Sequence, residues 1–165
     1  MESHWQTTVH DKIYERRSRL GPDVAEVAEH AGVTWNTLMD MEGGEEEIYL
    51  GARLGEQKRV YQFLGLDILE LFDLNCCFCR EEGSAYEDLC GLSRNEIVRK
   101  RREALGLSQR EFDEAAEFKE GAVERMEADP DYLDSFPIDE LRYLADGLKI
   151  PLQLLLGTKC ARCGR

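Results

Sequence analysis

The sequence has few of the residues that interrupt helices, and it lacks the features of a membrane or secreted protein. It contains 4 prolines among 165 residues, and no apolar run approaches the ~20 residues that a membrane-spanning helix needs. Residues 1–5 lack the basic and apolar segments of a secretory signal. These absences argue against membrane, collagen-like and low-complexity proteins. We therefore expect a folded cytoplasmic protein that makes no contact with a membrane.

Basic residues are scarce, above all in the first half of the chain. Asp and Glu outnumber Lys and Arg by 34 to 21, which gives a formal net charge of -13. Residues 1–75 contain 15 acidic and 7 basic residues, whereas residues 93–165 contain 15 and 13. This balance disfavours non-specific binding to nucleic acid, although the local potential decides a specific site. A halophilic source would also produce such an excess of acidic residues.

Motifs of catalysis are absent. The sequence contains no phosphate-binding glycine loop, no His-Glu-x-x-His and no Gly-x-Ser-x-Gly. The many carboxylates fit the polar faces of amphipathic helices and need no chemical role. We therefore predict that the protein is not an enzyme and assign no catalytic residue.

An internal repeat divides the chain into two copies. Residues 17–21 align with residues 102–106 at a separation of 85, and residues 38–42 align with residues 123–127. The second copy is one residue shorter in the loop that follows, so that beyond this loop equivalent residues are 84 apart. The cysteines also align at this separation. The pairs at this separation include Leu71 with Leu155, Cys76 with Cys160, and Cys79 with Cys163.

Each copy is predicted to form five short helices and no strand. Residues 93–96 and 108–111 are capping boxes that begin helices, and Gly106 ends the first of them. No segment alternates between apolar and polar residues over a strand's length. We therefore predict an all-α protein with domains at 1–79 and 93–165, joined by a linker at 80–92. The predicted core residues are Leu20, Val27, Val33, Leu38, Met41, Leu64, Leu71, Leu105, Phe112, Phe118, Val123, Met126, Leu144 and Leu155.

The second copy resembles the helix-turn-helix family of phage repressors and Cro, also called the xenobiotic-response-element type. The resemblance spans about residues 93–157, and residues 8–74 look like a more divergent copy. The residues that carry it are 97–109, Phe112, Phe118, Val123, 126–127 and 141–152. The resemblance implies two tandem five-helix, lambda-repressor-like domains. It also implies that the third helix of a copy enters the major groove of double-stranded DNA.

The resemblance further implies which side chains of the second copy would contact DNA. Gln109 matches a frequent glutamine of the family that contacts phosphate and braces the reading helix. Arg99 and Arg102 could add contacts to the DNA backbone, although residues 99–102 point in different directions because successive helical side chains lie about 100° apart. The candidate contacts are Gln109, Lys119, Glu120, Ala122, Arg125, Arg99 and Arg102.

The first copy fits DNA binding less well. It has no Lys or Arg from Leu20 to Ala52, so it offers little to neutralise phosphates. Thr34, Asn36 and Thr37 could still form hydrogen bonds with base edges. Trp35, beside acidic residues, is suited to anchor a protein partner if exposed, or else packs against the fourth helix.

Four of the six cysteines predict a metal site. Cys76 and Cys79, and likewise Cys160 and Cys163, have the Cys-x-x-Cys spacing that lets one turn present two thiolates to a zinc ion. Each pair follows the fifth helix of its own copy, so a pseudo-twofold arrangement of the copies would bring the four sulfurs together. We therefore predict one structural zinc ion per chain, bound by these four cysteines and joining the two domains.

The cysteine pattern is also compatible with three different roles. Cys76, Cys79 and Cys90 could bind a metal together with His4 or His10. The pairs could instead form disulfides that act as redox switches, or they could be inert buried thiols.

Two functions from different classes follow. We predict a DNA-binding transcriptional regulator, most simply a repressor, in which the second copy reads DNA and the two copies imitate a repressor dimer within one chain. The alternative is an acidic protein-interaction module, resembling an antitoxin or anti-activator, whose first domain binds a protein partner. A homodimer is compatible with either function.

Overall fold

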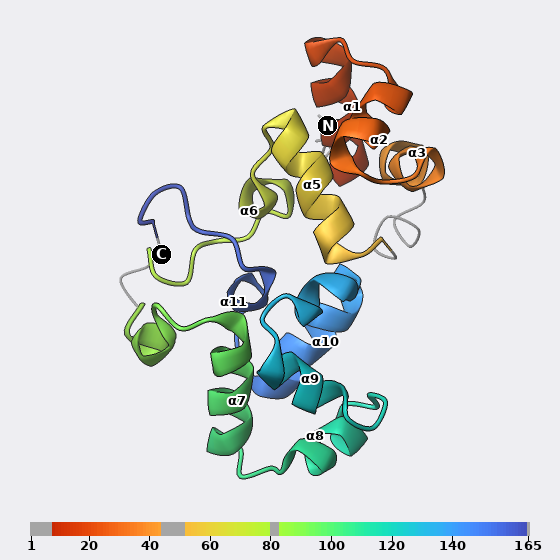
Figure 1. The fold of residues 1–165 in the computed structure, drawn as a ribbon. Coiled ribbons are helices and arrows are strands. Elements are labelled where there is room, and N and C mark those ends of the chain that lie inside the picture. Colours follow the sequence, from red (N-terminus) through yellow and green to blue (C-terminus); the bar gives the residue numbers. More distant parts are fainter. Residues whose placement is uncertain (1–7, 44–51, 80–82, 165) are drawn as a thin grey trace, which may run out of the picture. The chain divides into compact units, whose positions relative to one another are not determined.

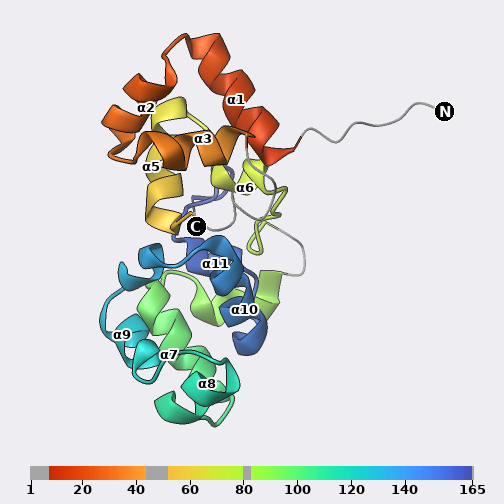
Figure 2. The same cartoon turned by 90° about the vertical axis from the view of Figure 1, so that its right-hand side faces the viewer.

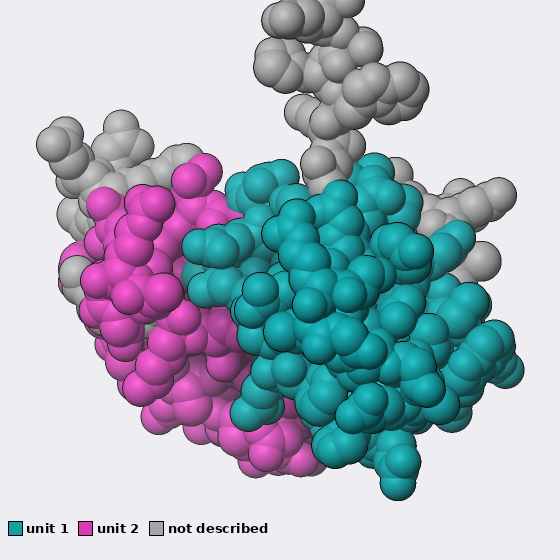
Figure 3. Space-filling model, turned by 90° about the horizontal axis from the view of Figure 1, so that it is seen from above, with its two compact units in different colours: residues 1–73 teal, residues 74–165 magenta. Residues whose placement is uncertain are grey.

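The computed structural model describes residues 8–43, 52–79 and 83–164. The described residues are helical and form no β-strand, which confirms the all-α prediction. The chain divides into two compact units, residues 1–73 (unit 1) and residues 74–165 (unit 2), which Figure 3 distinguishes by colour. Among the described helices, none has the length and apolar character needed to cross a membrane.

Unit 1 is built from five described helices (Figure 2). α1 packs against α3 and α5, and α2 packs against the same two helices. The bounds are α1 Val9–Leu20, α2 Val24–Ala31, α3 Trp35–Gly43, α5 Leu54–Leu64 and α6 Ile68–Leu71.

Unit 2 repeats this order of five helices and adds two 3-10 turns (Figure 1). α7 contacts α9, α10 and α11, and α8 contacts α9. The first 3-10 turn, η1 (Gly83–Leu89), lies in the segment predicted as a linker and has a buried Leu89. The other bounds are α7 Arg94–Ala104, α8 Gln109–Ala115, α9 Ala122–Ala128, η2 Tyr132–Ser135, α10 Ile138–Leu148 and α11 Gln153–Leu156.

The helix boundaries of the two units have matching local causes. Thr8 and Ser93, 85 residues apart, both form capping boxes at the start of the first helix. The second helix of each unit is capped by the side chain of Asp23 or Ser108, which accepts a hydrogen bond from the third helical residue. The repeat seen in the sequence is therefore a repeat of capping geometry as well.

An ion pair, buried in unit 2 and partly buried in unit 1, joins the first and third helices in each unit. In unit 1, Arg17 donates to the two carboxylate oxygens of Glu42 at 2.5 and 2.7 Å. In unit 2, Arg102 donates to Glu127 in the same way at 2.5 and 3.1 Å. Each arginine also donates to the backbone carbonyl five residues ahead. The third helix of both units is therefore held by the same charged contact.

The predicted core is largely confirmed, with one clear error. Of the predicted core residues, Val33, Leu105 and Phe118 are half-buried and Leu20 is 50 % exposed, whereas the other ten are buried. Leu20 is the last residue of α1, and the chain turns away at Gly21, whose φ is 90°. The prediction for Leu20 was wrong because α1 ends at this residue, and its side chain is not covered by the rest of unit 1.

Candidate functional site

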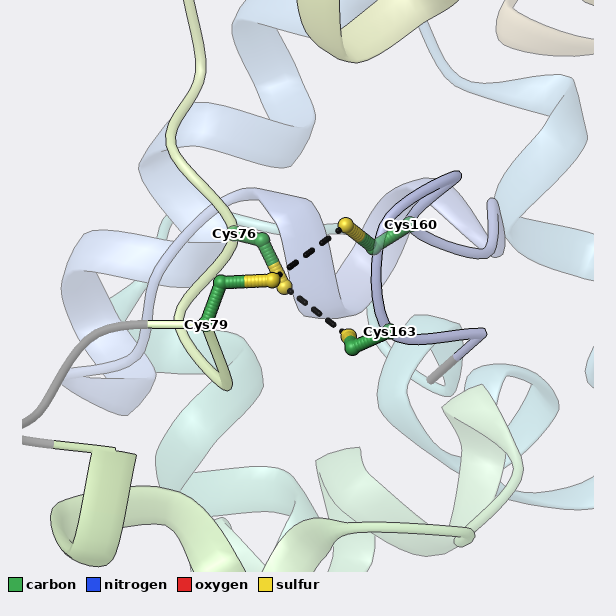
Figure 4. A group of neighbouring side chains, drawn as sticks. All are labelled: Cys76, Cys79, Cys160 and Cys163. Atoms are coloured by element: carbon green, nitrogen blue, oxygen red, sulfur yellow. Dashed lines mark hydrogen bonds between the residues drawn. The ribbon is translucent and has the colours of Figure 1, made fainter.

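The four cysteines of the two Cys-x-x-Cys pairs form one cluster in unit 2 (Figure 4). Their sulfur atoms all lie within 4.8 Å of one another. The Sγ atoms of Cys76 and Cys163 are 3.6 Å apart, and those of Cys79 and Cys160 are also 3.6 Å apart. A tetrahedron with metal–sulfur distances of about 2.3 Å has edges of about 3.8 Å, so the spacing fits a single metal ion.

Two short loops present these sulfurs. One follows α6 and the other follows α11, and Figure 4 shows the loops facing each other across the cluster. In the first loop the N–H of Cys79 donates to the carbonyl of Cys76 at 3.3 Å, and in the second the N–H of Gly164 donates to the carbonyl of Cys160 at 2.8 Å. These turns direct both thiols of a pair to the same side.

Hydrogen bonds to sulfur and to the loop backbone support the cluster. Gln153, buried at the start of α11, donates its Nε2–H to the Sγ of Cys76 at 3.5 Å and accepts the backbone N–H of Cys77 at 2.8 Å. The backbone N–H of Arg162 donates to the Sγ of Cys160 at 3.4 Å. Such N–H donors stabilise thiolate ligands and orient them, as outer contacts do in metal sites.

The protonation of the cluster is uneven. Burial alone would raise the pKa of Cys76, but hydrogen bonds from Gln153, the backbone of Phe78 and the neighbouring thiols lower it to about 6. Hydrogen bonds with the sulfurs of Cys160, Cys163 and Cys76 raise the pKa of Cys79 to about 12. The thiolate of Cys76 therefore forms readily, while the thiol of Cys79 keeps its proton until a metal displaces it.

Within the described residues, the remaining cysteines and histidines are not among the four residues of the cluster. All six cysteines are free thiols, and Cys90, at the end of η1, is not in the group that could hold a metal. Burial is the main cause that raises the pKa of Cys77 to about 11, so its thiol stays protonated. The ring of His10 lies 3.9 Å from the carboxylate of Asp11 in unit 1. His4 lies outside the described residues.

The candidate reading helix, α9, begins at Ala122, after the first two candidate contacts predicted near it. Lys119 and Glu120 precede it and are exposed, Arg125 is exposed on it, and Ala122 is buried at its start. Lys119 and Arg125 form no ion pair within the described ranges. Of the candidate contacts on this helix, Ala122 alone is not on the surface.

The candidates on α7 and α8 converge on Glu127 of α9. Arg102 is buried against this carboxylate, Arg99 donates to the Glu127 backbone carbonyl at 3.0 Å, and Gln109 donates to its Oε2 at 2.7 Å. Gln109 and Arg102 thus brace α9. The half-buried Gln109 and the exposed Arg99 still have surface to offer a ligand.

Sequence reasoning missed a second brace on α9. Asp113 in α8 is buried and accepts the backbone N–H groups of Gly121 at 2.8 Å and Val123 at 2.9 Å. A carboxylate at an otherwise apolar position, five residues after the helix cap, was the available signal. The equivalent of Asp113 in unit 1 is Ala28, which has no carboxylate to accept such hydrogen bonds. In unit 1 the start of α3 is capped by Thr34, whose hydroxyl accepts the backbone N–H of Thr37 at 3.0 Å.

The candidate contacts of unit 1 are mostly on its surface. Thr34 and Asn36 are exposed and Thr37 is half-buried, but the hydroxyl groups of the two threonines lie 2.8 Å apart and bond to each other. Trp35 is 53 % exposed, so its side chain is available on the surface of α3 and is not buried against the fourth helix.

No known family model, curated protein or solved structure matches the chain.

Proposed function

We propose that this chain is a DNA-binding transcriptional regulator that contacts double-stranded DNA through α8 and α9 of unit 2. The observation that carries the proposal is the surface at α9. Lys119, just before the helix, and Arg125, on it, are exposed and unpaired within the described residues, while Arg102 and Gln109 hold the helix through Glu127. A helix that is rigidly braced and presents free cations is suited to enter a groove of DNA.

The comparison of the two units supports unit 2 as the reader. Lys119 and Arg125 correspond to Thr34 and Asp40 in unit 1, so the same positions carry two cations in one copy and none in the other. Phosphate neutralisation supplies most of the affinity for DNA. We assign Arg102 a bracing role because its guanidinium is occupied by Glu127 and by the carbonyl of Leu107.

A salt series with selected DNA tests this proposal. The full chain is used to enrich binding sites from a pool of random duplexes, and affinity for the winning site is measured from low to physiological salt. Lys119→Glu and Arg125→Glu should each weaken binding at least about tenfold, and replacement of a phosphate contact by a neutral residue should lower the salt slope by about 1. Arg19→Glu in unit 1 makes the same change in net charge and should have little effect. Failure to enrich any sequence would refute the proposal.

The alternative function, an acidic protein-interaction module, is favoured by a specific feature of the same surface. The exposed residues Glu117, Glu120 and Glu124 each lie within two residues of Lys119 or Arg125 along the chain. Like charge repels the phosphate backbone and would limit binding to a site with strong specific contacts. If the selection yields no DNA and the chain binds a basic protein instead, this second function takes the place of the first.

We further propose that the four-cysteine cluster binds zinc and that the zinc is structural. Four thiolates complete a tetrahedral shell and leave no position for water or substrate. Protein purified under reducing conditions should contain about one zinc per chain, and cobalt substitution should give the absorption spectrum of a tetrahedral tetrathiolate site. The paired change Cys160→Ser with Cys163→Ser should abolish metal binding, whereas Cys90→Ser should retain it. Absence of zinc from reduced protein, or binding by the double variant, would contradict the assignment.

A further inference from the structure

The outer face of α3 in unit 1 carries apolar side chains. Trp35 is 53 % exposed and Met39 is 36 % exposed, and their separation by four residues places them on the same side of the helix. Among the described residues, four of the five exposed large hydrophobic side chains belong to unit 1. These four are Tyr14, Leu20, Trp35 and Met39.

This apolar face is not required by the fold, as the other copy demonstrates. The equivalents of Trp35 and Met39 in unit 2 are Glu120 and Glu124, both exposed. The third helix is nevertheless held to the first by the same Arg–Glu pair in both units. The apolar residues of unit 1 therefore stand where a folded copy of this domain accepts carboxylates. Covering their exposed apolar surface removes it from water, which would favour binding of a partner.

The surroundings of this face are negative. The sequence has no Lys or Arg from Leu20 to Gly43, and the α2–α3 region exposes the carboxylates of Asp23, Glu26, Glu29 and Asp40. Arg17 is neutralised by its ion pair with Glu42, whereas Arg59 keeps its charge because it donates only to the backbone carbonyls of Ala31 and Gly32 at the α2–α3 turn. The four exposed carboxylates outnumber this cation, so the rim keeps a net negative charge.

We propose that the Trp35–Met39 face, defined by these two residues and the carboxylates on α2 and α3, docks a basic amphipathic helix of a partner protein. A Trp anchor surrounded by polar groups is typical of an interaction hot spot, and a flexible Met adapts to the partner's surface. The partner's Lys and Arg side chains would face the carboxylate rim. DNA is negatively charged and would be repelled by the carboxylate rim. A second copy of this chain, whose net charge is -13, would be repelled in the same way. The inference does not depend on DNA binding by unit 2.

A labelled model peptide provides the test. The probe is a helical peptide with Leu on one face and Lys on the other, and its fluorescence anisotropy is measured with the full chain. Trp35→Ala and Met39→Ala leave the net charge unchanged and should each weaken binding at least about tenfold, because they remove anchor area. Asp40→Lys should also weaken binding and reduce its salt dependence. Tyr143→Ala, which removes an exposed aromatic side chain from unit 2, should leave affinity within about twofold of the parent chain.

Three results would overturn the proposal. The first is equal affinity of the parent, Trp35→Ala and Met39→Ala chains, since binding would then reflect net charge alone. The second is equal affinity for a matched peptide with Glu in place of Lys. The third is a dimer in sedimentation equilibrium that dissociates in the folded Trp35→Ala chain, since the face would then belong to a second copy. Helix content by circular dichroism verifies that each variant is folded.

Discussion

The guanidinium of Arg102 and the carboxylate of Glu127 form a buried ion pair that fastens α9 to α7. The carboxylate is only 2 % exposed and also accepts a hydrogen bond from Gln109. The same pair recurs as Arg17 and Glu42 in unit 1. Each partner has lost most of its hydration, so removing one leaves the other charged and poorly solvated.

Glu127→Ala should therefore cost about 3–5 kcal/mol of unfolding free energy, because it leaves Arg102 and Gln109 without their acceptor. Denaturant unfolding followed by circular dichroism measures the loss. Glu124→Ala, on the exposed side of the same helix, should change stability by less than about 0.5 kcal/mol. Equal losses of unfolding free energy in the two variants would show that the buried ion pair adds no stability beyond that of an exposed carboxylate.

Acid should weaken unit 2 through the same residue. Burial alone raises the pKa of Glu127, but hydrogen bonds from Arg102 and Gln109 outweigh it and hold the pKa below the usual value of 4.5. Because the native pKa lies below the unfolded one, the stabilisation is complete above about pH 4.5 and is lost as the pH falls through the native pKa. The stability difference between the parent chain and Glu127→Gln should shrink below pH 4.5. A difference that stays constant from pH 7 to pH 3 would contradict this.

The helical order could be predicted because its signals are local. Ser93 and Ser108 begin helices through capping boxes, and Gly106 ends one by adopting a positive φ of 73°. The cysteine cluster was predictable for a different reason. The repeat relates Cys76 to Cys160 and Cys79 to Cys163, so the Cys-x-x-Cys spacing of a metal site occurs at the same place in both copies.

The contacts between helices could not be predicted from such signals. Arg102 was predicted as a candidate DNA contact because basic residues on the first helix of the copy could reach the DNA backbone. Its partner Glu127 is 25 residues away, beyond the reach of any helical pattern. The identical spacing between Arg17 and Glu42 was the only available hint. The role of Gln153 was likewise invisible, since it depends on a loop 76 residues earlier in the chain.

Gln153→Leu should weaken metal binding about 10–100-fold, because it removes the donor to the Sγ of Cys76 and the acceptor for the Cys77 N–H. Competition with a chelator of known affinity measures the change. Gln62→Leu alters an exposed glutamine in unit 1 and serves as the matched control. An unchanged affinity in folded Gln153→Leu protein would remove this residue from the metal centre.

Metal binding should release protons and weaken in acid. The pKa of about 6 for Cys76 means that this thiol is mostly ionised at pH 7, whereas Cys79, with a pKa of about 12, keeps its proton until the metal displaces it. Calorimetry of zinc binding at pH 7 in buffers with different ionisation enthalpies should therefore give buffer-dependent heats. The apparent affinity should fall further as the pH drops below 6. Heats that are independent of the buffer would show that the cluster is already fully ionised without metal.

Gly157, which ends α11 before the second cysteine loop, should tolerate no side chain. Its φ is +67°, and an added Cβ would lie 2.9 Å from the Nε of Arg94. The guanidinium of Arg94 cannot move aside freely, because it donates to Asp134 at 2.7 Å and packs at the core of unit 2. Gly157→Ala therefore combines left-handed backbone strain with overpacking.

Gly106→Ala isolates the first of these two costs. Its φ is +73° and nothing lies within 4 Å of the added Cβ, so only the backbone cost of about 1–2 kcal/mol applies. Gly157→Ala should lose a further ~1–3 kcal/mol of unfolding free energy, because the new methyl group displaces Arg94 from its ion pair. Denaturant unfolding of both variants gives the comparison. If Gly157→Ala and Gly106→Ala lose the same unfolding free energy, the side chain of Arg94 can move away from the new methyl group. The close contact between Gly157 and Arg94 would then not be what fixes the start of the cysteine loop.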